Sequence, residues 1–136
     1  MRAPPNRTPR AGGLTAAALA VLLLLLAAPA VALGRLEPGI DWRLLAGGVL
    51  AMSLFTWLSY WSDKRRAEAG EWRIPESTLH LGELLGGWPG AFLAQRQFRH
   101  KTAKVSYQIV FWLIVLLYEF VALDFLQGWK LTRALV

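Results

Sequence analysis

Three side chains able to bind a metal ion or transfer a proton share one predicted helical face. Glu76, His80 and Glu83 are spaced by four and then three residues, so a helix places them one above the other. Two carboxylates and an imidazole in this arrangement suit a divalent metal ion or acid–base chemistry. In the alternative, structural interpretation, Glu76 lies at a membrane interface and His80 and Glu83 hydrogen-bond each other or a neighbouring helix. No second motif completes a metal site, so neither a metal ion nor another cofactor is predicted.

A second set of polar residues flanks the same segment and is mostly cationic. Its members are Asp63, Lys64, Arg65, Arg66, Arg73, Arg99, His100 and Lys101. If the two ends of the segment at residues 75–98 lie together, these residues meet Glu76 in one charged cluster. The cluster then pins the base of the segment through paired charges, or its cations capture an anionic headgroup or phosphate. The two roles are compatible.

The composition indicates a membrane protein of one domain. The chain has 136 residues, 55% of them hydrophobic, and a formal net charge of +6. In a membrane protein Lys and Arg collect on the cytoplasmic side, so topology explains this charge better than nucleic-acid binding does. The chain has no cysteine, which excludes disulfides, thiolate catalysis and Cys-ligated metals. Nucleophile-elbow, P-loop and dinucleotide motifs are also absent, as is an internal repeat typical of transporters.

Four apolar stretches must position the polar residues. They are residues 14–33, 44–61, 79–93 and 105–126. A bilayer core of about 30 Å requires about 20 helical residues. The first and last stretches meet this length, and the second meets it with Trp57, Tyr60 and Trp61 placed at headgroup level. The third stretch is too short and too interrupted for a simple span.

The interruption of the third stretch predicts a turn between two half-helices. Four residues carry it: Gly86, Gly87, Pro89 and Gly90. Glycine can end a helix in a left-handed conformation, and proline suits the first turn of the next one. The half-helices would run from about residue 75 to 85 and from 89 to 98, each about half a bilayer long. A segment that turns back also keeps more Lys and Arg on the inner side than one that spans.

The sequence therefore predicts an all-α membrane protein with three transmembrane helices and a re-entrant helical hairpin. The alternative is four transmembrane helices, one of them kinked at proline. The predicted regions are a basic tail at 1–13, a transmembrane helix or signal peptide at 14–33, a membrane domain at 44–126 and a C-terminal tail at 127–136. Ala30-Val31-Ala32 is typical of a signal-peptidase site, whereas the length of the first stretch favours a retained helix.

The motifs around the turn resemble those of a known group. They are Trp61-Ser62-Asp63-Lys64, Trp72-Arg73-Ile74-Pro75-Glu76, Leu85-Gly86-Gly87-Trp88-Pro89-Gly90 and Arg99-His100-Lys101. This pattern resembles the bacterial membrane family catalogued as domain of unknown function 1294, over about residues 44–126. The resemblance implies a multi-pass protein of the bacterial inner membrane, without an established activity. Some relatives carry a cold-shock domain, but the first 43 residues here hold no aromatic strand for stacking bases, so nucleic acid is not an expected partner.

The predicted function is that of a small, non-enzymatic integral membrane protein. Its cationic cluster at the cytoplasmic face would bind anionic lipid or a protein partner, which includes a second copy of the chain. The alternative is a membrane enzyme that acts on a lipid or phosphate-bearing substrate. In that case Glu76, His80, Glu83 and His100 would serve as metal ligands or acid–base groups.

Overall fold

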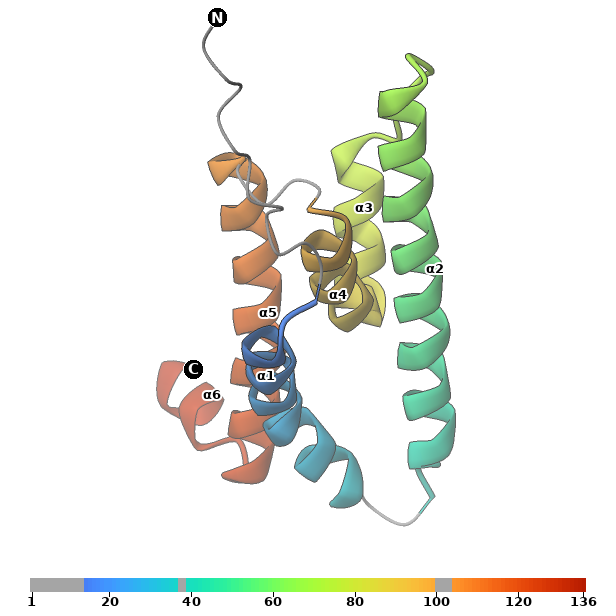
Figure 1. Cartoon of the computed structure of the whole chain (residues 1–136). Coiled ribbons are helices and arrows are strands. Elements are labelled where there is room, and N and C mark those ends of the chain that lie inside the picture. Colours follow the sequence, from blue (N-terminus) through green and yellow to red (C-terminus); the bar gives the residue numbers. More distant parts are fainter. Residues whose placement is uncertain (1–13, 37–38, 100–103) are drawn as a thin grey trace, which may run out of the picture.

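The computed structural model describes residues 14–36, 39–99 and 104–136, and all the regular structure in these ranges is helical (Figure 1). The elements are α1 (Ala16–Gly34), α2 (Trp42–Glu68), α3 (Glu76–Gly82), the π-helical turn η1 (Glu83–Gly87), α4 (Trp88–Phe98), α5 (Val105–Leu126) and α6 (Lys130–Leu135). The prediction of an all-α chain is confirmed over this part of the molecule.

Three of these helices are long and apolar enough to cross a membrane. They are α1 with 19 residues, α2 with 27 and α5 with 22. Most of their large apolar side chains are exposed, as expected of helices that contact lipid chains. The three helices contain the first, second and fourth apolar stretches of the sequence.

Local capping explains where the long helices begin and end. The Thr15 hydroxyl accepts a hydrogen bond from the Ala18 N–H at 3.1 Å, and Asp41 accepts one from Arg43 at 2.9 Å. Helix α2 runs seven residues past the apolar stretch, because its last turns hold good helix formers and its basic residues favour the negative end of the dipole. Asp63 and the cations Lys64, Arg65 and Arg66 therefore lie on a helix, beyond the end of the apolar stretch.

The third apolar stretch forms α3, η1 and α4, and its helical path breaks at Gly86. This residue has φ 115° and ψ 0°, a conformation that glycine adopts without steric cost. Pro89 follows in the first turn of α4, where the missing N–H has no helical partner to lose. The break thus falls within the predicted turn.

Both ends of this α3–α4 segment contact neighbouring residues of α2. The Ile74 N–H donates to Asp63 Oδ1 at 2.9 Å, and Lys64 Nζ donates to the Phe98 carbonyl at 2.5 Å. In Figure 1 the segment lies between α2 and α5, and α1 lies against α5. This enclosure explains why nearly every residue from Trp88 to Gln95 is buried.

Glycines allow the segment to approach the backbone of α2 closely. A Cβ at Gly90 would lie 2.0 Å from the Ser53 carbonyl oxygen, and a Cβ at Gly87 would lie 2.0 Å from Thr56 Oγ1. Ser53 and Thr56 are themselves small, as is typical of close helix packing in membranes. The packing between α2 and α4 therefore requires glycine at both positions.

Candidate functional site

A buried carboxylate occupies the centre of the helical bundle. The Glu83 side chain is fully buried, and its Oε1 atom accepts hydrogen bonds from the hydroxyls of Tyr60 and Tyr107, the latter at 3.1 Å. Its Oε2 atom lies 2.7 Å from His80 Nδ1. A charge buried at this depth is costly unless polar groups surround it, and two tyrosine hydroxyls and an imidazole lie within hydrogen-bond distance of Glu83.

Two amides extend this arrangement across the bundle. Gln95 Nε2 donates to the Tyr60 hydroxyl at 3.1 Å, and Gln108 Nε2 donates to Gln95 Oε1 at 2.8 Å. The resulting buried polar network comprises Tyr60, His80, Glu83, Gln95, Tyr107 and Gln108. Because its members come from α2, α3, η1, α4 and α5, the network fixes the α3–α4 segment against both long helices.

His80 lies at the edge of the buried polar network. Its side chain is 15% exposed, whereas that of Glu83 is 0% exposed. Its ring stacks on Tyr107 with 4.1 Å between ring centroids and an interplanar angle of 28°. The imidazole is therefore held by a carboxylate on one nitrogen and by an aromatic face.

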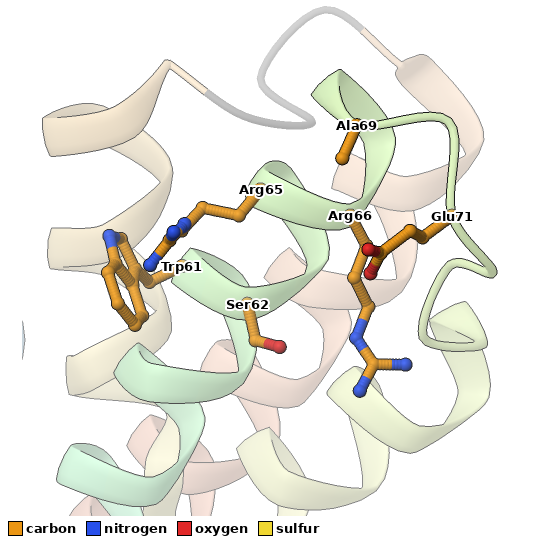
Figure 2. Close-up of a pocket in the computed structure, with 6 residues that line it drawn as sticks. All are labelled: Trp61, Ser62, Arg65, Arg66, Ala69 and Glu71. Atoms are coloured by element: carbon orange, nitrogen blue, oxygen red, sulfur yellow. The ribbon is translucent and has the colours of Figure 1, made fainter.

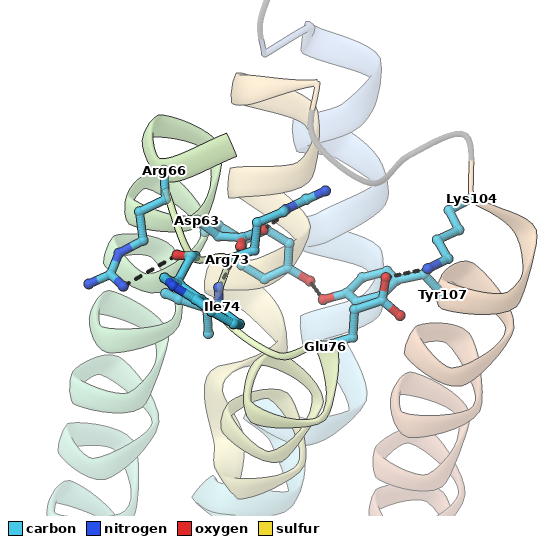
Figure 3. Close-up of polar contacts among 9 residues, drawn as sticks. Asp63, Arg66, Arg73, Ile74, Glu76, Lys104 and Tyr107 are labelled. Carbon is cyan, nitrogen blue, oxygen red and sulfur yellow. Dashed lines mark hydrogen bonds and ion pairs between the residues drawn. The ribbon is translucent and has the colours of Figure 1, made fainter. Parts of the chain in front are cut away.

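Charged side chains form a separate set of contacts at one end of the bundle (Figure 3). Buried Asp63 accepts from Arg73 Nη2 at 3.2 Å as well as from the Ile74 N–H. Lys104 pairs with Glu76 at 2.5 Å, beside Tyr107. We call this the basic end of the bundle; its described cations are Lys64, Arg65, Arg66, Arg73, Arg99 and Lys104.

The structure divides the predicted site residues between these two regions. Asp63, Lys64 and Arg73 meet at the basic end, and Arg99 ends α4 in a left-handed conformation with φ 50°. His100 and Lys101 lie outside the described residues.

The candidate metal ligands are not brought together. Glu76 pairs with Lys104, whereas His80 and Glu83 pair with each other, as in the structural interpretation. Within residues 14–36, 39–99 and 104–136, no group of three or more His, Cys, Asp or Glu side chains is placed to hold a metal ion.

The sequence interpretation missed four members of the network: Tyr60, Gln95, Tyr107 and Gln108. The expectation for Tyr60 concerned only its level in the membrane, and the structure shows that its side chain is fully buried between helices. A signal for this burial exists, because the buried residues Thr56, Tyr60 and Asp63 form a polar stripe along the otherwise apolar α2. The two glutamines carry no such signal, since their partners lie on other helices.

A shallow pocket of about 240 Å³ opens on the outer side of α2 at the basic end (Figure 2). Trp61, Ser62, Arg65, Arg66, Ala69 and Glu71 line it, and we call it the α2 pocket. The Arg65 guanidinium lies over the Trp61 ring, 4.7 Å from its centroid, and Arg66 Nη1 donates to the Trp72 carbonyl at 3.4 Å. Ser62 lies between the two arginines.

These features define a helical protein with three membrane-compatible helices around a broken helical segment. Residues 53–107 match the model of the family described as "Protein of unknown function (DUF1294)", which confirms the resemblance drawn from the motifs. The match runs from the middle of α2 to the start of α5 and so includes Tyr60, Glu83, Gln95 and Tyr107.

The chain is also similar to a curated protein over part of its length. The "Uncharacterized protein YsdA" of Bacillus subtilis (strain 168) is 41% identical over 46 residues, which cover 34% of this chain and 52% of that protein. The match thus spans about half the length of the curated relative. No solved structure matches the chain. Because the family has no known function, any function must be argued from the site.

Proposed function

We propose that this chain is a multi-pass protein of the bacterial inner membrane that binds anionic phospholipid in the α2 pocket. In this proposal the α3–α4 segment is a re-entrant hairpin whose base lies at the basic end. The single observation that carries lipid binding is the arrangement of Arg65 and Arg66 around Ser62, directly beside the exposed ring of Trp61.

The depth of the segment supports a re-entrant hairpin. Its tip at Gly86 lies against Val49, whereas both of its ends lie at the level of Asp63 and Lys64. At 1.5 Å per residue, the helix from Val49 to Lys64 rises roughly 22 Å. This distance is about three quarters of a bilayer core of about 30 Å, so the tip would lie inside the membrane if Lys64 lies at its surface.

The hydrogen bonds at the tip suit a broken helix at membrane depth. Such backbone is tolerated only where protein or water satisfies its polar groups. The Tyr118 hydroxyl donates to the Leu84 carbonyl at 2.5 Å, and Ser53 Oγ lies 3.5 Å from the Gly86 carbonyl oxygen. Two carbonyls beside the break, those of Leu84 and Gly86, thus have donors from flanking helices.

A cysteine-labelling experiment tests the topology, because the chain has no cysteine of its own. Single cysteines at exposed Ala67, Ser106 and Ala134 are treated in intact cells with a membrane-impermeant maleimide. Protection of positions 67 and 106 together with labelling of 134 is the expected pattern. Labelling of 106 with protection of 134 would mean that the segment spans the membrane.

Three of the six described cations at the basic end have partners at the hairpin base and are not available to a ligand. Lys64 bonds the Phe98 carbonyl, Arg73 pairs with Asp63, and Lys104 pairs with Glu76. Arg65 differs: within the described ranges it has the ring contact with Trp61 but no hydrogen bond or ion pair. Its N–H donors therefore suit an external anion.

An apolar strip leads from the α2 pocket along the same face of the helix. Leu54, Leu58 and Trp61 are spaced by four and three residues, with Arg65 four residues further on. Their exposed fractions are 60%, 44% and 40%. An acyl chain can lie along this strip while its phosphate reaches the guanidiniums through charge-assisted hydrogen bonds. This combination favours a phospholipid over a free phosphate or an acidic protein.

The test compares lipid retention by Arg65→Gln/Arg66→Gln with that by Arg43→Gln. Arg43 is a matched control, because it also lies over a tryptophan, 5.8 Å from the Trp42 ring centroid, at the opposite end of α2. At about 1 kcal/mol per cation, the double variant should lose about 2 kcal/mol, roughly 30-fold in affinity for phosphatidylglycerol. Native mass spectrometry measures this loss by comparing the retention of phosphatidylglycerol with the retention of phosphatidylcholine. Equal retention by the double variant and the control would contradict the proposal.

A further inference from the structure

The contacts of Glu83 determine which nitrogen of His80 carries a proton. The Tyr60 and Tyr107 hydroxyls lie within hydrogen-bond distance of Oε1 and of each other, so at least one of them donates to Oε1, as suits an ionised carboxylate. An ionised carboxylate can only accept, and the nitrogen 2.7 Å from its Oε2 atom is His80 Nδ1. Nδ1 therefore donates, and in the neutral ring Nε2 is left as an acceptor.

The Nε2 atom is the second nitrogen of a ring that lies one helical turn from the basic end. Within the described ranges no hydrogen bond reaches this atom, and the side chain keeps 15% of its surface exposed. His80 lies one helical turn after Glu76, and its stacking partner Tyr107 lies one turn after Lys104. Glu76 and Lys104 form an ion pair with each other. This ion pair therefore lies one helical turn closer to the basic end than the stacked rings of His80 and Tyr107.

We propose that His80 is a proton-accepting residue and that Glu83 is its positioning residue. The partner is an O–H group that reaches Nε2 from the basic end, either of water or of an alcohol on a lipid headgroup. The O–H bond breaks, its proton moves to Nε2, and the imidazolium is stabilised by the Glu83 carboxylate at Nδ1. The return step moves the proton from Nε2 back to the same oxygen and re-forms the O–H bond. This activity is independent of lipid binding in the α2 pocket.

Proton transport across the membrane does not fit the network. Its two partly exposed members, His80 and Gln108, lie one turn after Glu76 and Lys104 respectively, and those two residues are paired. Both partly exposed members therefore lie one helical turn from the basic end, and the other members are buried. This placement favours proton exchange from one side over transport across the membrane.

The first test is the tautomer of His80, measured by nitrogen-15 NMR on the full chain in nanodiscs, with His100→Gln used to assign the two histidine signals. We expect Nδ1 of His80 to be protonated and Nε2 to be unprotonated in the neutral ring. Protonation at Nε2 instead would overturn the proposal. This measurement uses the wild-type protein and so does not depend on the folding of any variant.

The second test is the rate at which diethylpyrocarbonate acylates His80, followed by mass spectrometry. Replacing a charge-assisted hydrogen bond by a neutral one in Glu83→Gln should slow the reaction at His80 roughly fivefold and leave His100 unchanged. Tyr118→Phe is the matched control, because it removes a hydrogen bond to the same hairpin without touching His80 or Glu83. Equal rates in Glu83→Gln and wild type, or an equal change in Tyr118→Phe, would refute the positioning role.

The lipid composition distinguishes the two sources of the O–H group. Phosphatidylglycerol has headgroup hydroxyls and phosphatidylcholine has none. A His80 Nε2 signal that shifts between nanodiscs of these lipids supports a lipid alcohol as the donor. An Nε2 signal that is the same in both, with hydrogen-bonded character, supports water.

Discussion

Replacing Gly90 by alanine should separate α4 from α2. The new Cβ would lie 2.0, 2.6 and 2.7 Å from the O, C and Cα atoms of Ser53, all of which are backbone atoms. An ordinary contact of this kind lies at 3.4–4 Å, so the helices must move apart by more than 1 Å. No flexible side chain can relieve the clash. Overpacking of a well-packed core costs about 1–3 kcal/mol, and we expect a loss near 3 kcal/mol because only backbone can move.

Gly48→Ala is the control for this change. Gly48 also lies in a helix, but a Cβ there meets no atom within 4 Å. Alanine should therefore stabilise α2 slightly, by about 0.5–1 kcal/mol from helix propensity. The free energy of unfolding of both variants is measured by titration with denaturing detergent in mixed micelles. If Gly90→Ala unfolds at the same point as Gly48→Ala, the close packing of α2 and α4 described above is wrong.

Three further substitutions test individual hydrogen bonds. Asp63→Ala leaves the Ile74 N–H and Arg73 without their acceptor and should cost about 2–3 kcal/mol in the same titration, whereas Asp63→Asn should cost less because an acceptor oxygen remains. Tyr118→Phe should cost about 1 kcal/mol, because the Leu84 carbonyl loses its hydrogen-bond donor. An unchanged free energy of unfolding would contradict the hydrogen bond from α5 to the backbone at the tip of the segment. Asp124→Ala removes the acceptor for the Leu131 and Thr132 N–H groups, so hydrogen exchange of these amides should rise about fivefold while the rest of the chain is unchanged.

The long helices and the break at Gly86 could be predicted because local residue types determine them. About 20 apolar residues predict a spanning helix, and Gly-Gly followed by Trp-Pro predicts a turn whatever surrounds it. The end of α2 was harder to predict, because charged residues after an apolar stretch are equally compatible with a link. Here the helix continues to Glu68, and this extension places Asp63 and Lys64 where they contact the segment.

The contacts among polar residues could be predicted only in part. The spacing of His80 and Glu83 predicted that their side chains could contact each other, and the structure contains this contact. The same spacing suggested that Glu76 would join them, but Lys104, 28 residues away, binds Glu76 instead. Tyr60 and Tyr107 are 47 residues apart and meet only because the α3–α4 segment packs between α2 and α5. Such pairs depend on tertiary packing, which helical periodicity does not contain.

The two sets of polar contacts hold the α3–α4 segment at different depths. Asp63, Lys64 and Lys104 fix its ends at the basic end, and Glu83 fixes its middle through tyrosines of α2 and α5. A buried ion pair or network is weak evidence for stability, because apolar residues of similar size often pack as well. Holding a hairpin that could otherwise slide along α2 explains the contacts at the ends without any chemistry. It does not explain a histidine whose second nitrogen stays open, and this difference is why His80 is the residue to test for activity.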